Sequence, residues 1–189
     1  MGTCDQRAYR ARRGRRQLAR RGGFVAAGRP RGDNRAVGRR YLIGVGNETM
    51  PDDGVGPRVA EAAAADAQPL GFETIVSGHD TAGILAYFDE TTERIVFVDC
   101  VRMGKTPGEW ACFSPDQVET RKSLGRLTTH EGDLLRIIEM ARQIGCPVPQ
   151  ITIVGIEPER IDPGLQLSPA LEARVREYVN VVLQLLRDG

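Results

Sequence analysis

Three side chains in this sequence have the types and positions that a metal-binding site requires. Asp53 belongs to an acidic pair that follows a glycine-containing turn, Asp99 ends an apolar run, and His130 lies in a later polar loop. Two carboxylates and an imidazole form a mixed oxygen and nitrogen ligand set, suited to zinc, nickel or iron, with positions left open for a substrate. We therefore take Asp53, Asp99 and His130 as candidate catalytic and metal-binding residues.

Each candidate also has a purely structural interpretation. Asp52 or Asp53 can cap the helix that we expect to follow, although two carboxylates are more than one cap requires. Asp99 can hydrogen-bond a turn, and His130 can be an exposed residue at a helix N-terminus. The only histidines are His79 and His130, which excludes a histidine-rich metal site.

The elements that must position these residues alternate between strands and helices from residue 40 onward. The run from Arg94 to Asp99 is apolar up to its final acid, as expected for a strand buried on both faces. Alternation of this kind predicts a doubly wound α/β fold, with a mostly parallel, twisted sheet of about five strands and helices on both faces. The loops after such strands meet at one edge of the sheet and form the ligand site. We expect strands at residues 40–46, 73–77, 94–99 and 150–156, an edge strand at 108–114, and helices near 56–67, 82–89, 131–144 and 168–187.

The chain divides into a basic N-terminal segment and an acidic remainder. Residues 1–40 contain 13 arginines and two aspartates, a net charge of +11, whereas residues 41–189 carry −10. The segment lacks helical or strand periodicity and has too little apolar surface to fold, so we expect it to be disordered. Three roles stay open: a tail for nucleic acid or another anionic surface, a transit peptide, and a dispensable extension from a start site placed too early. We treat residues 41–189 as one domain.

Composition excludes several classes of protein. No apolar run approaches the roughly 20 residues of a membrane span, so we expect no membrane partner. The cysteines lack the paired spacing of a zinc site. Isolated cysteines without a signal sequence favour the reducing cytoplasm.

The turn at Gly44 and Gly46 resembles the start of a dinucleotide-binding fingerprint. That fingerprint needs a third glycine, and Thr49 stands in its place. The neighbouring acids would also repel a pyrophosphate. We therefore expect no organic cofactor.

A series of short motifs has the order and spacing of one protein family. Across roughly residues 41–187 the chain resembles the hydrogenase maturation proteases, endopeptidases that process the large subunit of nickel–iron hydrogenases. The motifs that carry the resemblance are Gly44-Val45-Gly46-Asn47, Asp52-Asp53-Gly54-Val55-Gly56, Thr81-Ala82-Gly83, Val98-Asp99, Pro107-Gly108-Glu109, Thr128-Thr129-His130 and Val154-Gly155-Ile156-Glu157-Pro158.

The resemblance implies a phosphorylase/hydrolase-like version of the fold and an aspartic-type endopeptidase. Such an enzyme removes a short C-terminal peptide from the large-subunit precursor after nickel insertion. The family's metal-contacting positions fall on Asp53, Asp99 and His130, and many members carry glutamate at the first of them. The resemblance further implies nickel carried by the precursor as the metal, a monomeric enzyme without a nucleic-acid partner, and a cytoplasmic location.

One motif departs from the family's pattern. The family usually carries Asp-x-Gly-Thr-x-Gly after the second strand, whereas this chain reads Ser77-Gly78-His79-Asp80-Thr81-Ala82-Gly83. The acid is therefore displaced to Asp80 or replaced by Ser77. His79 is either an adventitious ligand or an exposed side chain.

Three mechanisms stay open for the metal. In the first, the metal docks the precursor and so verifies that nickel has been loaded. In the second, the metal polarises the scissile carbonyl or activates a water. In the third, the metal stays outside the chemical step and a carboxylate acts as general base. The rival functions are a nickel-binding escort without hydrolytic activity, a small-molecule hydrolase or phosphorylase on the same fold, and nucleic-acid binding by the arginine-rich tail.

Overall fold

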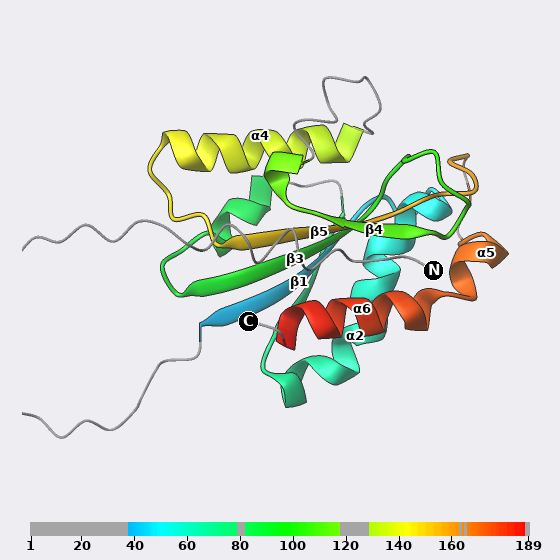
Figure 1. The fold of residues 1–189 in the computed structure, drawn as a ribbon, viewed down its shortest axis with the longest axis horizontal. Helices are drawn as coiled ribbons and strands as arrows, with labels where there is room; N and C mark the ends of the chain where they lie inside the picture. The colour runs from blue at the N-terminus through cyan, green and yellow to red at the C-terminus, as the bar shows by residue number, and fades with distance from the viewer. Residues whose placement is uncertain (1–37, 79–81, 118–128, 163, 165, 188–189) are drawn as a thin grey trace, which may run out of the picture.

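The computed structural model describes residues 38–78, 82–117, 129–162, 164 and 166–187. Within them, five strands form one sheet in the order β2-β1-β3-β5-β4 (Figure 1). β4 runs antiparallel to β5, and the other neighbours are parallel. The predicted α/β fold is confirmed, and so is the extra strand at the edge. The strands are β1 (Arg39–Val45), β2 (Glu73–Gly78), β3 (Thr92–Cys100), β4 (Trp110–Phe113) and β5 (Gln150–Ile156).

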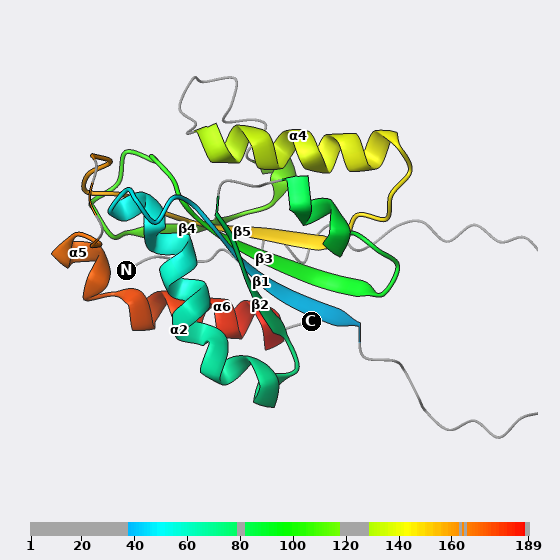
Figure 2. The same ribbon diagram turned by 180° about the vertical axis from the view of Figure 1, so that it is seen from behind.

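Helices cover both faces of the sheet. α2 and α6 pack on one face, and α4 packs with the 3₁₀ helix η2 on the other (Figures 1 and 2). No helix in the described part of the chain is long and apolar enough to cross a membrane. The helices are η1 (Asp52–Gly54), α2 (Val55–Leu70), η2 (Ala82–Tyr87), α4 (Thr129–Gln143), α5 (Pro169–Glu172) and α6 (Val175–Arg187).

Two helix predictions were partly wrong. The helix predicted at 82–89 is a 3₁₀ helix, in which Phe88 N–H donates to the carbonyl of Leu85, three residues earlier. The helix predicted at 168–187 is divided into α5 and α6 because Arg174 N–H also bonds three residues back, to Leu171. Such tighter hydrogen bonds interrupt the α-helical ladder.

β3 is the central strand and is buried on both faces, as its apolar sequence predicted. Val96, Val98 and Cys100 join the core under α2 and α6. Ile95 and Phe97 point to the opposite side and join the core under α4. Because alternate side chains of β3 enter the cores on the two faces of the sheet, packing holds the strand in place, and with it Asp99 near its end.

β1 and α2 meet in direct backbone contact at two glycines. A Cβ atom on Gly56 would lie 2.2 Å from the carbonyl oxygen of Val45 and 2.4 Å from that of Val98. A Cβ atom on Gly44 would lie 2.3 Å from the carbonyl oxygen of Gly56. We predicted that Gly44 serves the turn, but it lies inside β1 and allows this contact. Gly46, with φ of 140°, is the residue that turns the chain.

Arg40, which we had assigned to the basic segment, lies in β1 and joins two helix ends. Its guanidinium donates to the carbonyl oxygens of Leu70, at the end of α2, and of Leu186, near the end of α6, each at 2.8 Å. The buried Arg94 donates to the carbonyl of Leu185. A cation at a helix C-terminus is favourable because it meets the exposed carbonyl groups and the negative end of the dipole. The predicted disordered tail up to residue 37 lies outside the described residues.

The contact between β1 and α2 predicts a sharp difference between two neighbouring glycines. Gly56→Ala places a methyl group against two carbonyl oxygens and is expected to lower the free energy of unfolding by about 3 kcal/mol. Gly54→Ala is the matched control, because φ is −75° there and the nearest atom to a Cβ is 3.4 Å away. It is expected to change stability by less than about 1 kcal/mol. Urea denaturation followed by circular dichroism measures both, and equal losses would contradict the proposed contact.

Candidate functional site

The predicted site residues come from elements that meet at the carboxyl edge of the sheet. Asp53 lies in η1, directly after the loop that leaves β1, and η1 contacts β3. Asp99 is the second-last residue of β3 and pairs with Gly155 of β5. α4, which has His130 in its first turn, begins at the same edge (Figure 1). The topology thus brings all three backbone positions to one rim.

Asp53 is 6% exposed and stabilises the loop between β1 and η1. Its Oδ2 accepts a hydrogen bond from the backbone N–H of Asn47 at 3.2 Å. Asn47 in turn accepts the N–H of Thr49 at 2.9 Å. These bonds order the glycine loop and fix the carboxylate near the rim.

The structural interpretation in which one of the two acids caps α2 is wrong. The N-cap residue of α2 is Gly54, and no side chain caps that helix. The reason is η1, which inserts a 3₁₀ turn between the acidic pair and the start of α2. The two carboxylates instead accept backbone N–H groups outside α2.

Asp52 anchors the loop that follows β5. The residue is fully buried, and its Oδ2 accepts the backbone N–H groups of Glu159 at 2.8 Å and Arg160 at 2.9 Å. Its Oδ1 accepts the N–H of Ser168 at 2.7 Å. Three bonds to backbone N–H groups are typical of a structural carboxylate. Asp52 therefore has a structural role between two loops, whereas the hydrogen bond of Asp53 to Asn47 lies within the loop after β1.

Asp99 is 1% exposed at the end of β3. Its Oδ1 accepts the N–H of the next residue, Cys100, at 2.8 Å. This local bond turns the carboxylate at the point where the chain leaves the sheet. Asp99 therefore has a fixed orientation before any partner arrives.

Glu157 is a further buried acid of the rim that we did not select from the sequence. It follows β5 directly and is 6% exposed. Its Oε2 accepts the N–H groups of Met103 at 2.6 Å and Lys105 at 3.0 Å, in the loop after β3. The signal was present, because an acid directly after an apolar strand is the same pattern that drew attention to Asp99.

Tyr178 holds the loop after β3 through a hydrogen bond. Its hydroxyl donates to the carbonyl oxygen of Gly108 at 2.7 Å. Burial raises the pKa of Tyr178 to about 12, so the phenol stays protonated and remains a donor at neutral pH. Nearby, a hydrogen bond from Arg174 lowers the pKa of Glu177, which also accepts the indole N–H of Trp110 at 2.8 Å.

The structure describes the side chains of only some of the predicted metal-binding residues. Among the residues whose side chains the structure gives, no three His, Cys, Asp or Glu side chains gather closely enough to hold a metal ion. The side chain of His130 lies outside that description, as do His79 and Asp80. The joint ligation of a metal by Asp53, Asp99 and His130 therefore stays a prediction.

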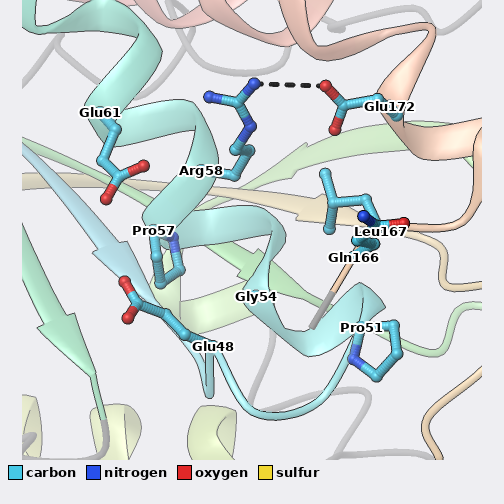
Figure 3. Close-up of a pocket in the computed structure, with 9 residues that line it drawn as sticks. All are labelled: Glu48, Pro51, Gly54, Pro57, Arg58, Glu61, Gln166, Leu167 and Glu172. Carbon is cyan, nitrogen blue, oxygen red and sulfur yellow. Dashed lines mark hydrogen bonds and ion pairs between the residues drawn. The ribbon is translucent and has the colours of Figure 1, made fainter. Parts of the chain in front are cut away.

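A pocket of about 600 Å³ opens beside the glycine loop (Figure 3). An ion pair between Arg58 and Glu172, with 3.2 Å between nitrogen and oxygen, spans α2 and α5 at one side of it. Asp53 and Asp99 do not line the pocket, so the pocket is separate from the predicted metal site. The described lining residues are Glu48, Pro51, Gly54, Pro57, Arg58, Glu61, Gln166, Leu167 and Glu172.

Comparison with known proteins identifies the family. The family model described as hydrogenase maturation protease matches residues 57–185. The chain is 31% identical over 120 residues to the Hydrogenase 3 maturation protease of Escherichia coli K12, covering 62% of this chain and 72% of that protein. It is 26% identical over 153 residues to the Hydrogenase 2 maturation protease of the same organism, covering 80% of this chain and 92% of that protein.

Solved structures agree with this assignment. The hydrogenase maturation protease HybD from Thermococcus kodakarensis aligns with a TM-score of 0.66 at 25% identity, over 78% of this chain and 99% of that one. A hydrogenase 2 maturation peptidase from a Thaumarchaeota archaeon aligns with a TM-score of 0.57 at 32% identity, over 78% and 97%.

The fold and the sequence define a hydrolase of the endopeptidase class. This chain belongs to the hydrogenase maturation protease family, which confirms the resemblance inferred from its motifs. The matched region includes Asp99 and His130 and begins shortly after Asp53.

The different hydrogen bonds of Asp52 and Asp53 predict that the same substitution destabilises the protein to different extents at the two positions. Asp52→Asn puts an amide into a position that now accepts three N–H groups, so the free energy of unfolding is expected to fall by about 3 kcal/mol. Asp53→Asn is expected to lower it by about 1 kcal/mol. Urea midpoints of the two variants provide the comparison. A larger loss for Asp53→Asn would show that the structural and rim roles have been assigned the wrong way round.

Proposed function

We propose that this protein is the endopeptidase that removes the C-terminal peptide of a nickel-loaded hydrogenase large-subunit precursor during hydrogenase maturation. The observation that carries the proposal is the family match over residues 57–185. The fold supports it, because Asp53 in η1 and Asp99 near the end of β3 come from separate elements that meet at one edge of the sheet. The substrate is a protein, and the nickel belongs to that substrate.

In this proposal Asp53, Asp99 and His130 contact the nickel that the precursor carries. Carboxylate and imidazole are ligands that nickel accepts, and the precursor supplies the rest of its coordination. The carboxylates of Asp53 and Asp99 are already oriented by the N–H groups of Asn47 and Cys100. Pre-oriented groups need little rearrangement when the ion arrives.

The nickel contact serves chiefly to dock the precursor with its scissile bond near the rim. Such docking makes cleavage conditional on nickel insertion, because a precursor without nickel lacks the contact that holds it. Hydrolysis then requires a water, and a rim carboxylate is the group available as its general base. In this sense the enzyme is an aspartic-type endopeptidase without an organic cofactor of its own.

The enzyme would act as a cytoplasmic monomer that meets the precursor in a transient complex. The net charge of −10 on residues 41–189 supports association with a cationic surface of the partner. The rim offers mainly acids, which fits a metal-bearing protein better than the anionic substrate of a phosphorylase.

Removing a proposed nickel contact should abolish processing without unfolding the protein. Asp99→Ala and His130→Ala are expected to cut the rate of processing of a nickel-loaded precursor by about 100-fold or more, because each removes a contact to the ion. Glu139→Gln is the control, since Glu139 is an exposed residue of α4 whose carboxylate bonds Gln143. It should process at the parent rate. Mass spectrometry of the large subunit measures the loss of the C-terminal peptide.

The same assay separates protease from escort. The parent enzyme is expected to shorten the nickel-loaded large subunit and to leave the nickel-free precursor uncut. A large subunit of unchanged mass would favour a non-hydrolytic escort. Full processing by both Asp99→Ala and His130→Ala would end the nickel-docking proposal.

A further inference from the structure

Two buried carboxylates connect the three loops that form the rim. These loops are the one after β1 (residues 46–54), the one after β3 (residues 101–109) and the one after β5 (residues 157–168). Asp52, in the first loop, binds the backbone of the third. Glu157, in the third loop, binds the backbone of the second. We call this pair, Asp52 and Glu157, the rim clasp.

The Asp52 half of the clasp closes the loop after β5. One carboxylate takes the N–H groups of Glu159 and Arg160, at the start of that loop, and of Ser168, at its end. A further backbone bond joins the same two loops, from Gly164 N–H to the carbonyl of Thr49 at 3.1 Å. The loops after β1 and β5 are therefore held as one body.

The Glu157 half holds the loop after β3 at both of its ends. Its side chain accepts the N–H groups of Met103 and Lys105. Its backbone carbonyl accepts the N–H of Gly108, and its own N–H donates to the carbonyl of Glu109, each at 2.8 Å. Residues 102–107 are intermediate or exposed, and Met103 is the one among them that packs against the core. The Glu157 contacts add to the bond from Tyr178 to Gly108 in ordering this loop.

The clasp is connected through the chain to the two acids of the rim. Asp53 follows Asp52 in the chain, and Asp99 is the second-last residue of the strand from which the Glu157-bound loop departs. The carboxylates of the clasp each accept backbone N–H groups of a neighbouring loop. Their charge-assisted bonds are shorter and stronger than neutral ones and suit a rigid connection.

From these contacts we infer that Asp52 and Glu157 are positioning residues, which fix Asp53 and Asp99 relative to each other for the nickel-bearing precursor. The inference rests on the proposed function, since it assumes that both acids contact the nickel. Groups that orient metal-contacting residues typically change affinity or activity by about 10- to 100-fold when removed. Loss of the clasp should act mainly on recognition of the precursor, and so on KM.

Steady-state processing of the nickel-loaded precursor tests Glu157 directly. Glu157→Ala is expected to raise KM by about tenfold or more. Glu157→Gln should stay close to the parent, because its amide oxygen can still accept both N–H groups. Val182→Ala is the stability control, since Val182 is fully buried in α6 and belongs to the core. It should lose stability but keep the parent KM. All variants are assayed well below their melting temperatures.

The outcomes are distinct for the inference and for the proposed function. A KM of Glu157→Ala equal to that of Val182→Ala, or an equal loss in Glu157→Gln and Glu157→Ala, would overturn the positioning role. Full activity of Asp99→Ala would instead overturn the nickel contact on which it rests. If Glu157→Ala does not fold, Glu157→Asp replaces it, because the shorter carboxylate cannot reach both N–H groups and should raise KM in the same direction.

Discussion

The contact between β1 and α2 at Gly44 and Gly56 is the constraint on which the rest of the structure depends. No side chain fits between the two backbones there, so the start of α2 is pressed against the carbonyl groups of Val45 and Val98. Val98 directly precedes Asp99, and η1, with Asp53, directly precedes α2. A packing contact between glycines thus determines how near the two acids lie.

Four buried acids at the carboxyl edge of the sheet make two kinds of hydrogen bond. Asp52 and Glu157 are bound to backbone N–H groups of neighbouring loops. Asp53 and Asp99 each accept an N–H group from their own loop or strand end. The first pair connects loops across the rim, whereas the second orients its carboxylates locally. Residues of one chemical type therefore make different kinds of hydrogen bond according to the backbone that surrounds them, and the contacting role that we propose for Asp53 and Asp99 belongs to the second pair.

Much of the fold followed from the sequence, because apolar runs and strand–helix alternation are local signals. The central strand through Val96 and Val98 was clear for that reason. The position of Asp99 at its end was also predictable. The role of Asp52 was not, since its partners, Glu159 to Ser168, are more than 100 residues away in the chain. The division of the last helix depends on one tightened hydrogen bond, which no apolar pattern records.

The family assignment and the rim geometry meet in one claim, that the precursor's nickel gains ligands from this protein. X-ray absorption at the nickel edge tests it most directly, on the nickel-loaded precursor alone and in complex with the protease. We expect additional oxygen and nitrogen neighbours around nickel in the complex, and their loss when Asp99→Ala replaces the parent. An identical nickel spectrum with and without the protease would contradict it.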